Sequence, residues 1–400
     1  MVLDLKKMKK NTLDAKNKVV QILLLAVNPN LEGNRLVKLN TLVKDKTLDW
    51  DIFFQMIKKE NIQSIAANNL IKFVGKNLPS FVFERLKELL KRITINNLKK
   101  LKGLKETLDI FSKHNIPCIP WKGPLFANDL YANPILRESV DLDILVQEKD
   151  LIKAKDILLE ANYQPIWKLT EAQEDFYLEH THSYDLITLD GQILELHKSL
   201  ARKYYMLQLS MEDFWGESQD VIFLNSSVKY PSVEHLFLGI AIHHGGRDCW
   251  IKFKLLIDWY ALLCRYPNVN WGNLLNKANE LGIRRILCVG TLMCNRLFDY
   301  PIPSEMKKYI KRKEKNIANR LLDNLFAADK LAKQSYLVVE LREKLYHRVL
   351  VLFKIFFSES LSDVFFSNNP VIRFLYRPIR LFNKFVLKKE SFVEKEYSNL

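Results

Sequence analysis

The chain contains 400 residues, of which 48% are apolar, and it carries a formal net charge of +15 at pH 7. This length allows two or three domains with a sizeable core, and only 12 Gly and 13 Pro residues argue against a fibrous protein, a low-complexity protein or a turn-rich β-sandwich. The positive charge suits an anionic partner such as nucleic acid, nucleotide or a membrane surface, but the abundance of Lys, Asn and Ile accounts for it equally well, so charge alone identifies no partner.

The first 115 residues are predicted to be helical. The apolar run at residues 22–27 is expected to form a helix that ends before Pro29. Apolar residues from Trp50 to Ile57 recur at helical spacing, and so do those that follow Pro79-Ser80, a pair typical of a helix start. Residues 97–113 are expected to form a basic amphipathic helix.

The pattern changes after residue 115. Residues 116–121 are a candidate strand, followed by a Lys-Gly-Pro turn and a helix to about residue 131. Residues 140–146 alternate as a strand does, and residues 151–161 have the spacing of a helix. Asp190-Gly191 between two apolar runs predicts a hairpin of residues 184–189 and 192–197.

Helical spacing returns near Ser232 and continues to the end of the chain. Residues 356–386 are aromatic and basic, with Arg373, Arg377, Arg380 and Lys384. We therefore predict an α+β fold with a small mixed-sheet core at residues 116–225. Helical regions at residues 1–115 and 226–400 are expected to flank this core, the second ending in a basic tail suited to contact with an anionic surface.

The sequence predicts neither secretion nor membrane insertion. Its basic start is followed by too short an apolar run and by Asn28-Pro29 in place of a cleavage site. No stretch reaches the roughly 18 apolar residues of a membrane span. The five cysteines form no C-x-x-C pair, which argues against a disulfide framework or a zinc site. We expect a cytoplasmic protein without a transmembrane segment.

Asp141-Leu142-Asp143 falls within the predicted strand at residues 140–146. Side chains alternate across a strand, so both Asp side chains are expected on one face, opposite Val140, Leu142 and Ile144. Neighbouring carboxylates repel each other unless a cation lies between them, and oxygen ligands suit Mg²⁺ or Mn²⁺. A polar face on an edge strand would explain the same pattern without an ion, so the pair alone is weak evidence.

A second strand, residues 193–197, adds a third carboxylate. Alternation places Glu195 and His197 on one face of this strand. Together with Asp141 and Asp143, Glu195 could complete a site that holds two metal ions and directs an in-line phosphoryl displacement. His197 either contacts a substrate or is a hydrogen-bonded structural histidine.

Lys122-Gly123-Pro124 lies between a predicted strand and a helix. Glycine lets the backbone approach a phosphate closely, and the free amides of a helix N-terminus attract anions. An ordinary turn with a surface lysine has the same sequence. Arg137, between this turn and the Asp pair, could hold a phosphate with its planar fork, or it could pair with Asp141 or Asp143.

The order of these motifs resembles the uncharacterised nucleotidyltransferase family of the DNA polymerase beta superfamily. The residues that carry the resemblance are WKGPLFANDLYANPILRESVDLDILV (residues 121–146) and ILELHKSL (residues 193–200). The segments SVEHLFLGIAIHHGG and KFKLLIDWYALL also resemble the helices that follow the catalytic unit of this family. The resemblance covers roughly residues 10 to 305.

This resemblance implies a metal- and NTP-dependent transferase. Asp141, Asp143 and Glu195 would be the catalytic, metal-binding carboxylates, with Mg²⁺ or Mn²⁺ as the metal. NTP, for example ATP, would be the co-substrate, and Glu195 would help position or deprotonate an acceptor hydroxyl. Lys122, Gly123, Arg137 and His197 would bind the nucleotide. Many superfamily members have Ser after the glycine, whereas Pro124 stands here, so Lys122 and Arg137 are expected to replace that contact.

His243-His244-Gly245-Gly246 is a further polar group. A metal-dependent phosphohydrolase would need an adjacent His-Asp pair, which this segment lacks, so a helix that ends at Gly245 is the simpler interpretation. Asp258 lies among apolar residues of a predicted helix and is expected to cap or pair near the site.

Two other functions fit parts of the pattern. A nucleotide-sugar glycosyltransferase also uses D-x-D with Mn²⁺, but it would not need Glu195 as a ligand or a helical start. A non-catalytic module could bind RNA, protein or a membrane surface, although three unneutralised carboxylates would weaken its binding of anions. The acceptor, whether a small molecule, a peptide, a protein or RNA, is not readable from the sequence.

Overall fold

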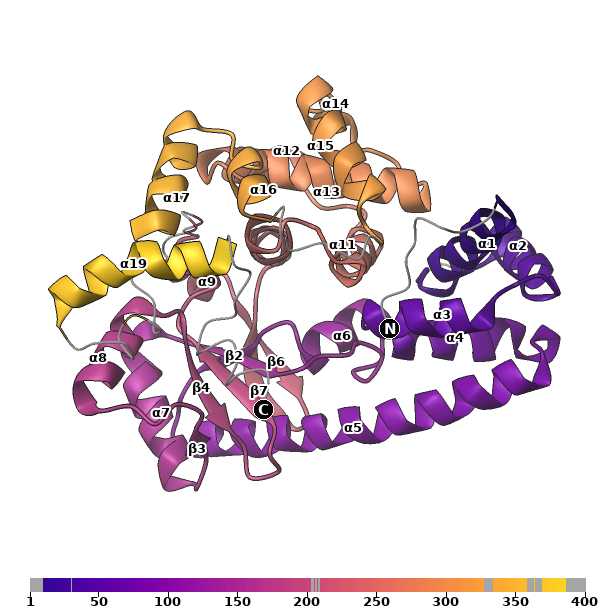
Figure 1. The fold of residues 1–400 in the computed structure, drawn as a ribbon. Helices are drawn as coiled ribbons and strands as arrows, with labels where there is room; N and C mark the ends of the chain where they lie inside the picture. The colour runs from indigo at the N-terminus through magenta and orange to yellow at the C-terminus, as the bar shows by residue number, and fades with distance from the viewer. Residues whose placement is uncertain are drawn as a thin grey trace.

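A computed structural model describes residues 10–29, 31–202, 205, 207, 209–326, 334–357, 363 and 369–385. Helices surround one mixed five-stranded sheet (Figure 1), which confirms the predicted α+β fold with helical flanks. No helix within these residues is both long and apolar enough to cross a membrane.

The N-terminal region is helical, as predicted. It contains α1 (Lys10–Ala26), α2 (Gly33–Val43), α3 (Trp50–Lys59), α4 (Gln63–Val74), the short η1 (Gly75–Asn77) and α5 (Ser80–Lys113). α1 ends before Pro29, and the Asp49 side chain caps α3 by accepting a hydrogen bond from the Ile52 amide at 3.0 Å. The two helices expected between residues 80 and 113 form one helix of 34 residues, α5.

α5 runs along the base of the molecule, from the N-terminal helices to the sheet (Figure 1). Val82 and Leu86, near its start, are buried in the core shared by the N-terminal and C-terminal helices. Leu108 and Phe111, near its end, are buried in a separate core around the sheet. One helix therefore belongs to both hydrophobic cores of the chain.

The sheet has the strand order β1-β2-β5-β4-β3. Its strands are β1 (Cys118–Pro120), β2 (Leu142–Val146), β3 (Gln164–Pro165), β4 (Ser183–Ile187) and β5 (Ile193–His197), and its connections contain α6 (Pro124–Tyr131), η2 (Glu148–Asp150), α7 (Leu151–Glu160) and α8 (Glu171–His180). β2 is parallel to β5, whereas the other pairs are antiparallel. The predicted Asp190-Gly191 hairpin joins β4 to β5, and Gly191 has the positive φ of 75° that this turn needs.

Two details of the predicted strands are wrong. β2 begins at Leu142, so Asp141 precedes the strand instead of lying in its middle, and Val140 is 69% exposed instead of sharing a buried face. The segment before β2 is held by side chains of other elements, not by a strand partner, which is why alternation does not extend to it. A further hairpin, β6 (Gln219–Phe223) and β7 (Ser226–Tyr230), was not predicted and packs beside β1 and α5.

The C-terminal region is helical, as predicted. After α9 (Met211–Gly216) and the β6–β7 hairpin, it contains α10 (Val233–Ile240), η4 (Ala241–Arg247), α11 (Phe253–Arg265), α12 (Trp271–Glu280), α13 (Arg284–Phe298), α14 (Ser304–Lys307), α15 (Arg312–Asp323), α16 (Gln334–Glu340), α17 (Leu345–Phe357) and α19 (Pro370–Phe385). Trp250 and Trp259 are fully buried between these helices.

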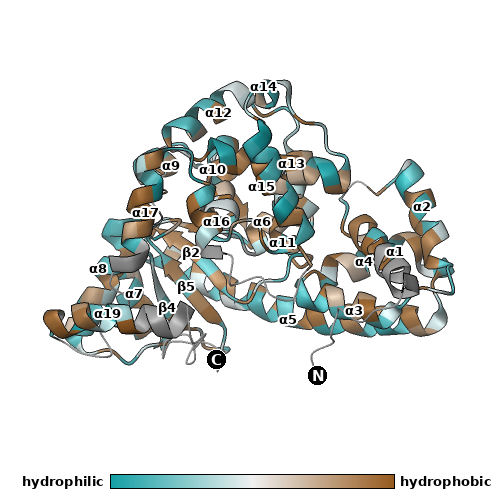
Figure 2. Cartoon of the chain, turned by 45° about the horizontal axis from the view of Figure 1, so that its top comes forward, coloured by the Kyte–Doolittle hydropathy of each residue, from teal (hydrophilic) through white to brown (hydrophobic). Residues whose placement is uncertain are grey.

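α19 turns much of its apolar side outward. Val371, Phe374 and Leu375 are exposed, whereas Arg377 is only 9% exposed (Figure 2 colours the chain by hydropathy). Within the predicted basic tail, the side chains of Arg380 and Lys384 and all of residues 386–400 lie outside the described part of the structure. The described part of α19 is therefore more apolar on its outer side than its sequence suggested.

Candidate functional site

A cleft of about 680 Å³ lies between the sheet and the C-terminal helices. Residues 59–61, at the end of α3, line part of it, and strands β2, β4 and β5 supply carboxylates on one side. η4 and α11 supply histidines and cations on the other side. All seven site residues predicted from the sequence except Gly123 and His197 line this cleft, and these two adjoin residues that do.

Three carboxylates lie in a row across the sheet. Asp143 of β2 is the register partner of Glu195 of β5, and Glu195 is in turn the partner of Asp185 of β4. Asp141, the residue directly before β2, lines the same cleft. We call Asp141, Asp143, Asp185, Glu195 and His197 the sheet wall.

Asp185 was missed by the sequence analysis. A two-residue turn at Asp190-Gly191 would pair residue 185 with residue 196, whereas the observed connection has three residues, 189–191, and places Asp185 opposite Glu195. Ser183 donates to Asp185 at 3.2 Å, and Trp167 donates to it at 3.4 Å.

Burial and mutual repulsion shape the electrostatics of the sheet wall. Burial, together with the charges of Asp143 and Glu195, raises the pKa of Asp141 to about 6. Burial and the charge of Glu195 raise the pKa of Asp185 to about 6 as well. Both carboxylates would therefore be stabilised by an added positive charge.

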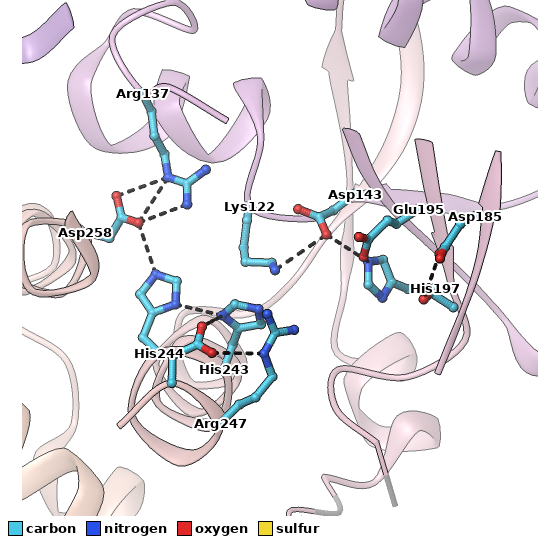
Figure 3. A network of polar contacts seen from close by, with 12 residues as sticks. Lys122, Arg137, Asp143, Asp185, Glu195, His197, His243, His244, Arg247 and Asp258 are labelled. Carbon is cyan, nitrogen blue, oxygen red and sulfur yellow. Dashed lines mark hydrogen bonds and ion pairs between the residues drawn. The ribbon is translucent and has the colours of Figure 1, made fainter. Parts of the chain in front are cut away.

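Two cations already approach the centre of this wall. His197 Nε2 lies 2.8 Å from Asp143 Oδ1 and 3.3 Å from Glu195 Oε2, and Lys122 Nζ lies 3.5 Å from the same Asp143 oxygen. Although burial opposes both shifts, these contacts lower the pKa of Asp143 and raise the pKa of His197 to about 9. Figure 3 shows Lys122 reaching toward Asp143 between the two sides of the cleft.

Asp143, Glu195 and His197 form a group that could hold a metal ion. One ligand atom from each lies within 4.8 Å of the others, and within the described residues no other set of three such side chains does so. The predicted trio of Asp141, Asp143 and Glu195 is thus brought into one cleft, but His197 takes the place of Asp141 in the compact group. Carboxylate oxygens are ligands that suit Mg²⁺ or Mn²⁺.

The predicted glycine turn is built on an uncommon backbone. Lys122 has a positive φ of 61°, and its side chain is buried, so it is not the surface lysine of an ordinary turn. The Gly123 amide donates to the Trp121 carbonyl at 2.9 Å, and Gly123 directly precedes α6. No atom lies within 4 Å of the position that a Cβ of Gly123 would occupy, so there is room beside its backbone.

Arg137 pairs with neither Asp141 nor Asp143, the two partners considered from the sequence. Its Nε and Nη2 atoms instead donate to the Asp258 carboxylate at 3.0–3.1 Å, across 121 residues. Although burial opposes it, the charge of Arg137 lowers the pKa of Asp258. The expectation that Asp258 pairs near the site is confirmed.

The expectation that a helix ends at Gly245 is wrong. The chain continues as a π-helix, η4, through Arg247, a local geometry often found at functional sites. The glycines serve close packing instead: a Cβ at Gly245 would lie 2.2 Å from Ile286, and one at Gly246 would lie 2.5 Å from Leu207.

The two histidines of η4 form a series of hydrogen bonds that begins at Asp258 (Figure 3). His244 Nε2 lies 3.0 Å from Asp258 Oδ2, and His244 Nδ1 lies 3.0 Å from His243 Nδ1. His243 Nδ1 also lies 3.6 Å from Asp248 Oδ2. We call Arg137, His243, His244, Asp248 and Asp258 the helical wall.

The segment before Asp141 is held from both helical regions. Lys100 of α5 donates to the Ser139 carbonyl, and Lys254 of α11 donates to the Glu138 carbonyl. Ser64 of α4 donates to the Leu136 carbonyl at 2.7 Å. These contacts, which no local sequence pattern indicated, position Asp141 at the edge of the cleft.

A family model described as uncharacterised nucleotidyltransferase matches residues 46–299. The match includes the whole sheet and every residue of both walls. Comparisons with curated proteins and with solved structures gave no match.

Proposed function

Because this chain belongs to the uncharacterised nucleotidyltransferase family, we propose that it transfers a nucleoside monophosphate from an NTP to a hydroxyl acceptor and releases pyrophosphate. The observation that supports this reaction best is the row of three carboxylates at the centre of the cleft, with a fourth beside it. Such a crowded set is unfavourable by itself and is relieved by divalent cations.

In this proposal, Asp143 and Glu195, with His197 in its neutral form, would hold one metal ion, and Asp141 with Asp143 would hold a second. Mg²⁺ or Mn²⁺ bound there would neutralise charge on the triphosphate and favour in-line displacement. Asp185 lies opposite Glu195 in the sheet register and adds a further carboxylate beside this group.

The phosphates would lie between the walls. The open space beside Gly123 admits them close to the backbone, and Lys122 contributes a buried positive charge. Arg137 acts mainly by anchoring Asp258, because Asp258 occupies its Nε and Nη2 atoms. The proposal also includes two predictions from the sequence. The chain is organised in three parts, residues 1–115, 116–225 and 226–400, and its basic tail contacts an anionic surface.

The experiment that tests the proposal is a thermal shift measurement with each of the four NTPs and Mg²⁺. We expect one or more NTPs to raise the melting temperature of the wild type and to leave Asp141→Ala/Asp143→Ala unchanged. Asp175→Ala/Asp323→Ala, which removes two exposed carboxylates outside the cleft, is the matched control and should respond like the wild type.

Two other results would contradict the proposal. A response to UDP- or GDP-sugars with Mn²⁺, without any response to NTPs, would indicate the nucleotide-sugar glycosyltransferase. No response to any of these ligands would favour a non-catalytic binding module.

A further inference from the structure

The helical wall ends in an imidazole nitrogen that has no partner. His243 lines the cleft and is only 7% exposed. Its Nε2 atom is buried and forms no hydrogen bond with any described residue. A buried polar atom without a partner is unfavourable in a folded protein, so this nitrogen indicates a place for a ligand group.

The contacts of the wall determine which nitrogens carry protons. Arg137 and His244 keep the Asp258 carboxylate ionised, so this carboxylate only accepts, and His244 Nε2–H must donate to it. Burial lowers the pKa of both His243 and His244, so each ring is neutral and carries one proton.

A neutral His244 with its proton on Nε2 has a lone pair on Nδ1. The neighbouring His243 Nδ1, at 3.0 Å, must then carry a proton and donate it to this lone pair. His243 has no second proton, so its Nε2 carries an unpaired lone pair. The series Asp258–His244–His243 therefore fixes an acceptor, and not a donor, at the end of the helical wall.

We propose that His243 Nε2 accepts the hydrogen bond of the acceptor hydroxyl and takes its proton during nucleotidyl transfer; this inference rests on the proposed function. The hydroxyl oxygen forms a bond to the α-phosphorus while its proton moves to His243 Nε2. The bond from the α-phosphorus to the bridging oxygen breaks, and pyrophosphate leaves with that electron pair. His244 and Asp258 are positioning residues, because they act through His243.

His243 suits this role better than Glu195, to which it was first assigned. Glu195 already lies 3.3 Å from His197 Nε2 and belongs to the candidate metal group. His243 comes from the opposite side of the cleft, so an acceptor would lie between it and a nucleotide on the sheet wall. The negative charge of a bound triphosphate would also raise the basicity of His243.

The first test compares nucleotide binding with turnover in His243→Asn. The Asn side-chain amide can still donate to His244 Nδ1, but nothing replaces the Nε2 lone pair. We expect the melting-temperature shift with Mg²⁺ and the preferred NTP to match that of the wild type. Pyrophosphate release with water or glycerol as the acceptor should fall by about 10²–10⁴-fold, the usual range for loss of a general base.

His235→Asn is the matched control, because His235 is a buried histidine of α10 that does not line the cleft. It should keep the wild-type rate. Wild-type turnover in His243→Asn would overturn this inference and leave the proposed function intact. No NTP binding and no pyrophosphate release by the wild type would overturn both.

A second test reads the proton positions directly. With ¹⁵N-labelled histidine, the signals lost in His243→Asn identify His243 in the wild-type spectrum. We expect a protonated Nδ1 and an unprotonated Nε2 at pH 7. A protonated Nε2, or a doubly protonated ring, would contradict the inference even if turnover were lost in the variant.

Discussion

The two walls of the cleft use charge in opposite ways. The sheet wall gathers carboxylates that raise one another's pKa, with Asp141 and Asp185 both near 6. The helical wall balances its charges internally, since Arg137 and His244 share the carboxylate of Asp258. Ligand binding should therefore stabilise the sheet wall. The ion pair and hydrogen bonds of the helical wall, in contrast, form without a ligand. Substitutions that separate activity from stability test this difference.

The largest effect is expected for Asp141→Asn, on activity. Losing this carboxylate should reduce pyrophosphate release by at least about 10³-fold, because charge on the metals and phosphates is no longer matched. The same change removes repulsion from the sheet wall, so the free energy of unfolding without ligand should rise by about 1–3 kcal/mol. Urea denaturation checks the second value, and a clear loss of stability would contradict the comparison.

Arg137→Met should have the opposite profile in stability. It leaves Asp258 buried without its main counter-charge, which typically lowers the free energy of unfolding by about 3–5 kcal/mol. Replacing both partners, as in Arg137→Met/Asp258→Leu, should recover a measurable part of that loss in urea denaturation. If the double variant were as unstable as the sum of the two single variants, the pair would not be coupled.

The buried Lys254, which lines the cleft, should make the free energy of unfolding depend on pH. Burial lowers its pKa to about 7, whereas an unfolded chain has the ordinary value near 10.4. Between these values the unfolded state binds more protons, so stability rises with pH from about 7 to about 10.4; it falls as pH is lowered through this window and is unchanged below about 7. Lys254→Met should remove roughly 3–5 kcal/mol of this rise, measured as the difference between the urea stabilities of the two proteins at pH 7 and pH 10.

The smallest effect is expected for Gly245→Ala. Its new methyl group would meet Ile286 and Trp250 in the packed region behind η4, so the free energy of unfolding should fall by about 1–3 kcal/mol. Gly272→Ala is the control, because its Cβ in α12 would meet only an ordinary contact at 3.4 Å. It should be neutral or slightly stabilising. Equal melting temperatures for the two variants would contradict the packing role of Gly245.

The two walls also differ in how far the sequence predicts them. Asp143 and Glu195 could be assigned to the site because strand alternation is a local pattern. Asp185 could not, because the connection between β4 and β5 has three residues, and a two-residue turn would have shifted the register by one residue and turned Asp185 to the other face. The pairing of Arg137 with Asp258 joins residues 121 positions apart and has no local pattern.

Some helices and strands could likewise be predicted from the sequence and others could not. Long amphipathic helices and the Asp190-Gly191 hairpin were predictable. The π-helix at His243 was not, because Gly245 there serves contact with Ile286 and Trp250 instead of ending a helix. β6 and β7 were missed because β6 is mostly exposed and has no alternation of buried and exposed residues.

α5 has a thermodynamic consequence for the whole chain. Since Val82 is buried in one hydrophobic core and Phe111 in the other, neither core can unfold completely without exposing part of the same helix. The regions should therefore melt as one cooperative unit. Free energy gained by a ligand in the cleft is then shared with those N-terminal helices that do not line the cleft, and should slow hydrogen exchange there as well.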